Sequence, residues 1–274
     1  MSFDLTKFEN ISVLDELSLW DAPFGLQLLD TIRMRDVKTI LDVGSGLGFP
    51  SIELAMRFGP GTEVFALDPW EAAVARAKWK AEIAGLQNYH TVAGTAEAIP
   101  FPENHFDLIV SNNGLNNVQD MLKSMQECRR VAKKNAQFVF TMNTEESLVE
   151  FYSVFRHVLT QNKMASELRA LEQHIHDKRK PIRVVDLLIE EAGWNEQQKI
   201  KGSFKFRYAS GSAMFAHFFI QVAFMEPWRK ILPEAQQTKI FDEIEQRLNV
   251  ISQERGELVM TIPFVTYECI PYPF

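Results

Sequence analysis

Between residues 38 and 143, short apolar runs rich in β-branched residues alternate with segments whose apolar side chains recur every three to four positions. The first pattern is typical of buried strands and the second of helices that cover a sheet. Their alternation predicts successive right-handed strand–helix–strand units around a parallel sheet. The expected strands are Thr39–Val43, Glu63–Leu67, Tyr89–Val92, Phe106–Val110 and Gln137–Met142.

The second half of the chain has a different rhythm. Residues 145–178 read as helical with many polar positions, and residues 184–192 as one more amphipathic helix that ends at Gly193. Two later segments, 199–206 and 258–269, alternate as strands do, with a helical stretch at 212–252 between them. The pattern predicts an α/β fold with a doubly wound, mostly parallel seven-stranded sheet and helical insertions in the C-terminal half.

A glycine-rich turn follows the first expected strand directly. Within Ile40-Leu41-Asp42-Val43-Gly44-Ser45-Gly46-Leu47-Gly48, the glycines allow positive φ and remove Cβ atoms, so a ligand can approach the main chain. The spacing G-x-G-x-G differs from the G-x-G-x-x-G of dinucleotide sites, which favours a ligand with a small charged head group over a pyrophosphate. A tight strand-to-helix connection without a ligand is the alternative.

Asp68 is the first acidic residue after the second expected strand, one strand–helix unit beyond the glycine turn. A carboxylate at this place can accept both hydroxyl hydrogens of a ribose. A helix N-cap or a solvated turn residue is the alternative. The neighbouring Pro69 and Trp70 could line an adenine slot, although an aromatic residue after a strand is more often part of the core.

Two further blocks follow in order, Gly94-Thr95-Ala96-Glu97-Ala98-Ile99-Pro100-Phe101-Pro102 and His105-Phe106-Asp107-Leu108-Ile109-Val110-Ser111-Asn112-Asn113. With the glycine turn and Asp68, they resemble the class I methyltransferases, in particular the small-molecule branch that includes ubiquinone and menaquinone methyltransferases. The resemblance covers about residues 20–143. It implies a Rossmann-like methyltransferase fold and S-adenosylmethionine as the cofactor.

The resemblance also implies roles for individual residues. The methionine part of the cofactor is expected at Gly44, Ser45, Gly46 and Gly48, the ribose at Asp68, and the adenine near Pro69, Trp70, Thr95, Ala96 and Glu97. The segment 112–118 corresponds to the block beside the sulfonium and the substrate. In this segment we expect Asn112 and Asn117 at the cofactor, and Asn113 and Asn116 at the substrate.

Two departures from the family pattern bear on function. Many relatives have an aspartate at the position of Thr95, so a charged contact to the adenine amine becomes a hydroxyl contact or is lost. The block from Asn112 carries asparagines where relatives commonly have histidines, and it is not of the N-P-P-Y type. This difference disfavours methylation of DNA adenine or glutamine.

The sequence pattern, together with the resemblance over residues 20–143, suggests a division of the chain into an N-terminal helical lid (1–37), a cofactor-binding core (38–144), a helical insertion (145–180) and a last part (181–274). The last part holds the end of the sheet and a helical cover for the substrate at about 211–253. The lid would place Phe8, Trp20 and Phe24 over the cofactor, and simple packing on the sheet is equally compatible with the pattern.

Residues 213–228 contain many aromatic side chains and could roof an apolar or aromatic acceptor. A packed helix in the core, or a contact in a homodimer, is the plainer interpretation. His217 in this segment is a candidate for contact with the substrate and for a general base, although a satisfied core histidine is the more common case. A base is optional, because the cofactor supplies an already activated methyl group.

Composition narrows the class of partner. The net charge of −7 gives no general attraction for nucleic acid, and two cysteines in 274 residues favour a reduced, cytoplasmic protein. The apolar stretch 213–225 is too short to span a membrane. His174 and His176 point apart on a helix, so no metal is expected. The sequence therefore favours methylation of a small molecule; an RNA or protein methyltransferase and a noncatalytic cofactor-binding protein are the alternatives.

Overall fold

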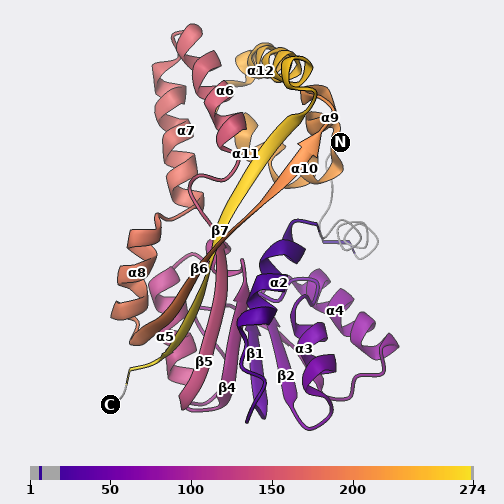
Figure 1. Cartoon of the computed structure of the whole chain (residues 1–274), viewed down its shortest axis with the longest axis vertical. Coiled ribbons are helices and arrows are strands. Elements are labelled where there is room, and N and C mark those ends of the chain that lie inside the picture. Colours follow the sequence, from indigo (N-terminus) through magenta and orange to yellow (C-terminus); the bar gives the residue numbers. More distant parts are fainter. Residues whose placement is uncertain (1–5, 8–18, 273–274) are drawn as a thin grey trace. The chain divides into compact units, whose positions relative to one another are not determined.

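The computed structural model describes residues 6–7 and 19–272, and it divides into two compact units (Figure 1). The first, here called the sheet unit, contains the described residues up to Asn143, Pro181–Gly202 and the residues from Phe264 onward. The second, here called the helical unit, contains Thr144–Lys180 and Ser203–Pro263.

The sheet has seven strands in the order β3-β2-β1-β4-β5-β7-β6. Strands β1 to β5 are parallel, and β7 pairs with β5 in the antiparallel direction, with Thr141 opposite Thr266. The strands are β1 (Thr39–Val43), β2 (Glu63–Asp68), β3 (Tyr89–Ala93), β4 (Phe106–Asn112), β5 (Ala132–Asn143), β6 (Trp194–Tyr208) and β7 (Leu258–Pro271). This arrangement confirms the predicted doubly wound, mostly parallel seven-stranded sheet.

Helices cover both faces of the sheet in the sheet unit (Figure 1). One face packs its alternate side chains, such as Ile40 and Val64, against α2 (Asp21–Thr31), α3 (Ser51–Phe58) and α4 (Glu71–Ile83). The other face packs residues such as Leu41 against α5 (Met121–Val131) and α8 (Ile182–Glu191). A short 3-10 helix, η1 (Leu115–Asn117), lies in the connection between β4 and α5. Both faces are apolar because a parallel sheet is buried on both sides.

The N-terminal part expected as a lid is described only in part. Helix α2 lies on the sheet, where Phe24 and Leu28 are fully buried. A lid over the cofactor stays a prediction. Phe8 and the other residues of 1–5 and 8–18 lie outside the described residues.

The helical unit has an aromatic core. The rings of Phe151 and Trp228 stack with centroids 4.0 Å apart, and the Tyr152 hydroxyl accepts hydrogen bonds from the Trp228 indole (3.1 Å) and the Arg179 guanidinium (3.2 Å). Its described helices are α6 (Val149–Gln161), α7 (Ala165–Lys178), α9 (Gly211–Ala216), α10 (Phe218–Ala223), α11 (Met225–Arg229) and α12 (Glu234–Arg255).

Residues 213–228 are mostly helical, as expected, but they do not form one packed helix. Three short helices, α9 to α11, occupy this segment, because the chain becomes extended at His217 and leaves helical geometry again at Phe224. Buried Met214, Phe215 and Trp228 come from these separate helices. The apolar residues of the segment therefore pack from different directions and do not form a single stripe.

Candidate ligand site at the carboxyl edge of the sheet

Strands β1 and β4 lie side by side in the sheet. After β1 the chain adds strands on one side of this pair (β2, β3), and after β4 it adds strands on the other side (β5, β7, β6). At such a switch point the loops after the two strands separate and leave a crevice at the carboxyl ends. Here the loops meet closely at one position, because a Cβ on Gly44 would lie 2.9 Å from the Cα of Gly114. Glycine at both positions lets these two loops approach each other.

The other glycines of the turn serve different purposes. A Cβ on Gly48 would lie 2.7 Å from Cδ1 of Ile52 and 3.1 Å from the Cβ of Ala77, so this glycine allows α3 and α4 to pack. Gly46 has φ +49°, and a Cβ there would meet no atom within 4 Å. Of the three glycines at 44, 46 and 48, Gly46 alone exposes main chain to open space where a ligand can approach.

Asp68, at the end of β2, is buried and joins the two loops of the site. One carboxylate oxygen accepts a hydrogen bond from the Gly46 amide and the other from the Trp70 amide, each at 2.8 Å. Burial raises the pKa of Asp68, and the two amide donors oppose that rise. Each oxygen retains a lone pair for a further donor. Pro69 is exposed and Trp70 half-buried, where α4 begins.

Asp42, inside β1, is a functional candidate that the sequence motifs did not single out. Its side chain is fully buried, and neither carboxyl oxygen has a hydrogen-bond partner among the described residues. Burial raises its pKa to about 7; the nearby hydroxyl and amide of Ser51, although outside hydrogen-bond geometry, oppose this rise, and the negative charge of Asp68 adds to it. No ion pair involves Asp42 or Asp68 in the described part of the chain. The signal in the sequence was an acidic residue within an otherwise apolar strand.

The loop after β3 brings the next candidates to the same edge of the sheet. Thr95 is exposed and Ala96 is buried. Glu97 is occupied, because its Oε1 accepts hydrogen bonds from the amides of Gln119 (2.8 Å) and Asp120 (3.3 Å). Glu97 therefore binds the segment that precedes α5. The sequence predicted a contact with the cofactor for Glu97 and did not predict this structural role.

Asn112, at the end of β4, has a carboxamide that connects three elements. Its Nδ2 donates to the carbonyl of Asp21 in α2 (3.1 Å), and its Oδ1 accepts from the Thr141 hydroxyl of β5 (3.0 Å). Burial raises the pKa of Asp21 to about 6. Trp20 is the residue before α2 and packs edge to face with Phe24, so it lies one residue from this contact.

The asparagines of the next turn form a cluster. Nδ2 of Asn116 donates to the Oδ1 atoms of Asn113 and Asn143. Asn113 has φ +58°, and its amide donates to the Thr141 hydroxyl. The Oδ1 of Asn116 is buried and has no partner among the described residues, while Asn117 is exposed. The cluster therefore presents one carboxamide oxygen that can still accept a hydrogen bond.

His217 belongs to the helical unit, whereas the other described candidates belong to the sheet unit. It is half-buried between α9 and α10, its ring lies 5.6 Å from that of Tyr208, and its Nδ1 is buried without a hydrogen-bond partner in the described residues. Within residues 6–7 and 19–272, no three histidine, cysteine or acidic side chains gather as metal ligands would.

These observations define a class of protein. A doubly wound sheet with an antiparallel β5–β7 pair, a glycine turn after β1 and a buried acid after β2 is the architecture of class I methyltransferases, as the resemblance implied. Residues 35–207 match the family model described as a methyltransferase domain, and this match covers more than half of the chain. The chain belongs to this methyltransferase family.

Individual relatives agree with this family. A demethylmenaquinone methyltransferase of Anoxybacillus flavithermus is 32% identical over 137 residues, which are 47% of this chain and 58% of the relative. The chain thus matches little more than half the length of this relative. An S-adenosylmethionine-dependent methyltransferase of Aquifex aeolicus has a similar fold, with a TM-score of 0.57, 19% identity and coverage of 98% of this chain and 100% of the other.

A second solved structure, the YcgJ protein of Bacillus subtilis, gives the same TM-score of 0.57 at 18% identity and covers 92% of this chain and 99% of its own. At these identities the two structures support the fold alone. Among the described residues, none of the helices has the length and apolar character needed to cross a membrane.

Proposed function

We propose that this methyltransferase binds S-adenosylmethionine at the carboxyl edge of the sheet and transfers its methyl group to a small molecule. The observation on which this proposal rests is the pair of buried carboxyl groups, Asp42 and Asp68, that have no cationic partner in the described residues. An adenosyl sulfonium carries a positive charge and ribose hydroxyl donors, so it supplies both groups that these carboxyls lack.

The local geometry fits this cofactor. The exposed main chain at Gly46 leaves space that any side chain would fill, and Asp68 has a free lone pair on each oxygen beside it. In our proposal Asp68 binds the ribose hydroxyls, Gly46 lies against the methionine part, and Asp42 provides negative charge beneath the turn. Trp70, Thr95 and Ala96 lie on the two neighbouring loops and would frame the adenine.

When bound, the cofactor supplies an electrophilic methyl group, so the chain's own residues need to orient the acceptor and exclude water. The asparagine cluster is suited to orientation, because the unpartnered Oδ1 of Asn116 can accept a hydrogen bond from an acceptor hydroxyl or amine. Carboxamides do not titrate, so this cluster positions an acceptor without removing its proton.

The named relatives support a small-molecule acceptor, since they are demethylmenaquinone methyltransferases. An apolar or aromatic acceptor agrees with that name and with the aromatic content of residues 213–228. The cytoplasmic location, the homodimer and a role for His217 stay predictions from the sequence.

Calorimetric titration of S-adenosylmethionine and of its demethylated product tests the cofactor site. We expect Asp68→Ala to weaken both by about 10- to 100-fold, because hydrogen bonds to a charged group contribute roughly 1.5–3 kcal/mol. Asp107→Ala is the matched control: Asp107 accepts hydrogen bonds from the amides of Lys38 and Thr39 at the other end of the strands. An equal loss in both variants, or none in Asp68→Ala, contradicts the ribose assignment.

Incubation of the protein with a metabolite extract and methyl-labelled cofactor tests the reaction. Label in small organic molecules supports the proposal. Label only in RNA or protein points to a macromolecular substrate, and tight binding without any transfer points to a noncatalytic binding protein. Either of these two results overturns the proposed reaction while it leaves the cofactor site intact.

A further inference from the structure

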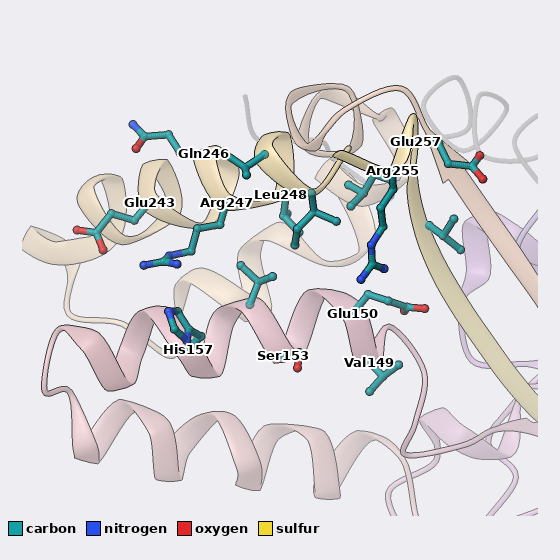
Figure 2. A pocket seen from close by; sticks show the side chains of 15 residues that line it. Val149, Glu150, Ser153, His157, Glu243, Gln246, Arg247, Leu248, Arg255 and Glu257 are labelled. Atoms are coloured by element: carbon teal, nitrogen blue, oxygen red, sulfur yellow. The ribbon is translucent and has the colours of Figure 1, made fainter. Parts of the chain in front are cut away.

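A second concave site lies wholly within the helical unit (Figure 2). It is a groove of about 960 Å³ between α6, α12 and the start of β7. The residues on each helix recur every three to four positions, as in Val149, Ser153 and His157 of α6, so each helix presents one continuous face to the groove. Its volume is within the range of roughly 300–1,000 Å³ of small-molecule sites.

The floor and edges of the groove are apolar. Val154, Leu248 and Leu258 are buried beneath it, while Val149 and Val250 at its edges are 46% and 51% exposed. A small side chain, Ser153, stands in the middle of the α6 face and leaves the groove open. An apolar chain laid along this floor would remove these aliphatic side chains from water.

The acidic side chains that line the groove are already occupied. Each of the three carboxylates accepts a hydrogen bond from another residue at 2.5 to 2.9 Å. The donors are Thr261 for Glu150, Asn162 for Glu243 and Arg207 for Glu257. Glu257 is thus paired with a cation, and Oε1 of Glu243 lies 3.8 Å from Nζ of Lys239. Glu150, in contrast, has only the neutral donors of Thr261 among the described residues.

The two arginines that line the groove, in contrast, have no internal partner among the described residues. Arg247 and Arg255 extend from α12 into the space above α6 (Figure 2), and neither has an ion pair or side-chain hydrogen bond among the described residues. His157 projects from α6 on the same side of the groove as Arg247. A guanidinium binds a carboxylate or phosphate with two parallel hydrogen bonds. The two arginines are eight positions apart, or about 12 Å along a helix.

We infer that this groove binds a dissolved amphipathic anion, an extended alkyl or isoprenoid chain that ends in a carboxylate or phosphate. The apolar floor takes the chain, and the unpaired arginines take the anionic end. Free amphiphile is favoured over a membrane surface, because the apolar residues line a concave groove between two helices and do not project from a convex face. The site is separate from the proposed cofactor site, since its residues all belong to the helical unit.

Calorimetry with dodecanoate, below its micelle-forming concentration and without cofactor, tests this inference. We expect saturable one-to-one binding that Arg247→Gln with Arg255→Gln weakens at least tenfold. The matched control removes two other exposed arginines of the helical unit, Arg169→Gln with Arg229→Gln, and should leave the affinity within a factor of two. Acetate, which lacks the chain, and dodecyltrimethylammonium, which lacks the anion, should not bind.

Ser153→Phe provides an independent variant, because it fills the groove without any change in charge. Dodecanoate binding should be lost while the circular dichroism spectrum and thermal transition persist. The inference is overturned by absent binding to the wild type, by equal losses in the two arginine pairs, or by full binding in a folded Ser153→Phe variant. Binding to vesicles of anionic phospholipid without binding to dissolved dodecanoate also overturns it. Because cofactor is absent throughout, the result is independent of the proposed methyl transfer.

Discussion

The carboxyl edge of the sheet and the groove of the helical unit differ in the sign of the charges that lack an internal partner. At the sheet edge, Asp42 and Asp68 are buried carboxyl groups without a cation among the described residues. In the groove, Arg247 and Arg255 are exposed cations without an ion pair in the described part of the chain, beside carboxylates that accept hydrogen bonds from other residues. In one chain of net charge −7 we thus propose a site for a cationic ligand and a site for an anionic ligand. The charges that lack an internal partner, and not the net charge, indicate the ligand of each site.

The two proposed sites also differ in whether main-chain or side-chain groups would contact the ligand. At the sheet edge, main chain is exposed at Gly46, while the nearby Asp68 is fixed by the amides of Gly46 and Trp70. In the groove, long arginine side chains extend from one face of a helix. A backbone site is rigid and sensitive to a single added carbon, whereas a site of long side chains responds more gradually to substitution.

The strongest test of this contrast is Gly46→Ala. The added Cβ projects into open space, so it meets no protein atom but occupies the region proposed for the cofactor. We expect the affinity for S-adenosylmethionine to fall at least 100-fold, measured by calorimetry. A loss of stability of roughly 1–2 kcal/mol should accompany this change, because φ at this position is positive.

Gly59→Ala is the control for that strain. Gly59 ends α3 with φ +73°, and a Cβ there also meets nothing within 4 Å. It should lose at least as much stability, because ψ at Gly59 is −176°, and it should keep cofactor affinity. Comparable affinity loss in both variants would mean that backbone strain, and not a filled ligand space, explains the effect of Gly46→Ala.

The next test concerns the buried acid of the sheet edge. Because burial raises the pKa of Asp42 to about 7, the folded protein holds a proton that the unfolded chain releases near pH 4. The free energy of unfolding should therefore fall as pH rises between these values, by up to about 1.4 kcal/mol per pH unit. Asp42→Asn removes this contribution, so the variant should match wild type at low pH and exceed its stability above pH 7.

Urea denaturation of both proteins at pH 5 and pH 8 measures this difference. The difference between wild type and Asp42→Asn is the informative quantity. Burial also raises the pKa of Asp21, but Asp21 titrates in both proteins, so its contribution cancels in the difference. A cationic cofactor favours the ionised Asp42, so its affinity for the wild type should also rise across the same interval. A stability difference that is equal at both pH values would contradict the assignment of a raised pKa to Asp42.

The fold of the sheet unit was largely predictable from the sequence, because its strands are local apolar runs, and its candidate site residues follow these strands directly. Strand β1 begins and ends at the predicted residues. Strand β5 begins at Ala132, five residues before the expected start, since the polar residues Lys133, Lys134 and Asn135 concealed its first part. Asp42 could not be singled out from the sequence, because only the fold shows that its carboxyl group is buried without a hydrogen-bond partner among the described residues.

The helical unit was less predictable, because its features depend on residues far apart in the sequence. Residues 212–252 were expected to be helical, and the breaks that divide them into four helices follow local backbone geometry at His217, Phe224 and before Glu234. The groove joins α6 to α12, which lie more than 70 residues apart. No local period reveals such a pairing, and unpaired arginines can be recognised only once the partners of nearby carboxylates are known.

The smallest expected effect is the dependence of the two ligand affinities on ionic strength. Raising sodium chloride from 0.05 to 0.5 M shortens the screening length from about 14 to about 4 Å, which weakens attraction between exposed charges far more than between buried ones. Arg247 and Arg255 are exposed, so dodecanoate affinity should fall about threefold, whereas S-adenosylmethionine affinity should change by less than about twofold because Asp42 is buried. Parallel titrations in both buffers measure this contrast. A larger loss at the sheet edge than in the groove would show that the buried carboxyls are open to solvent, contrary to the role proposed for Asp42.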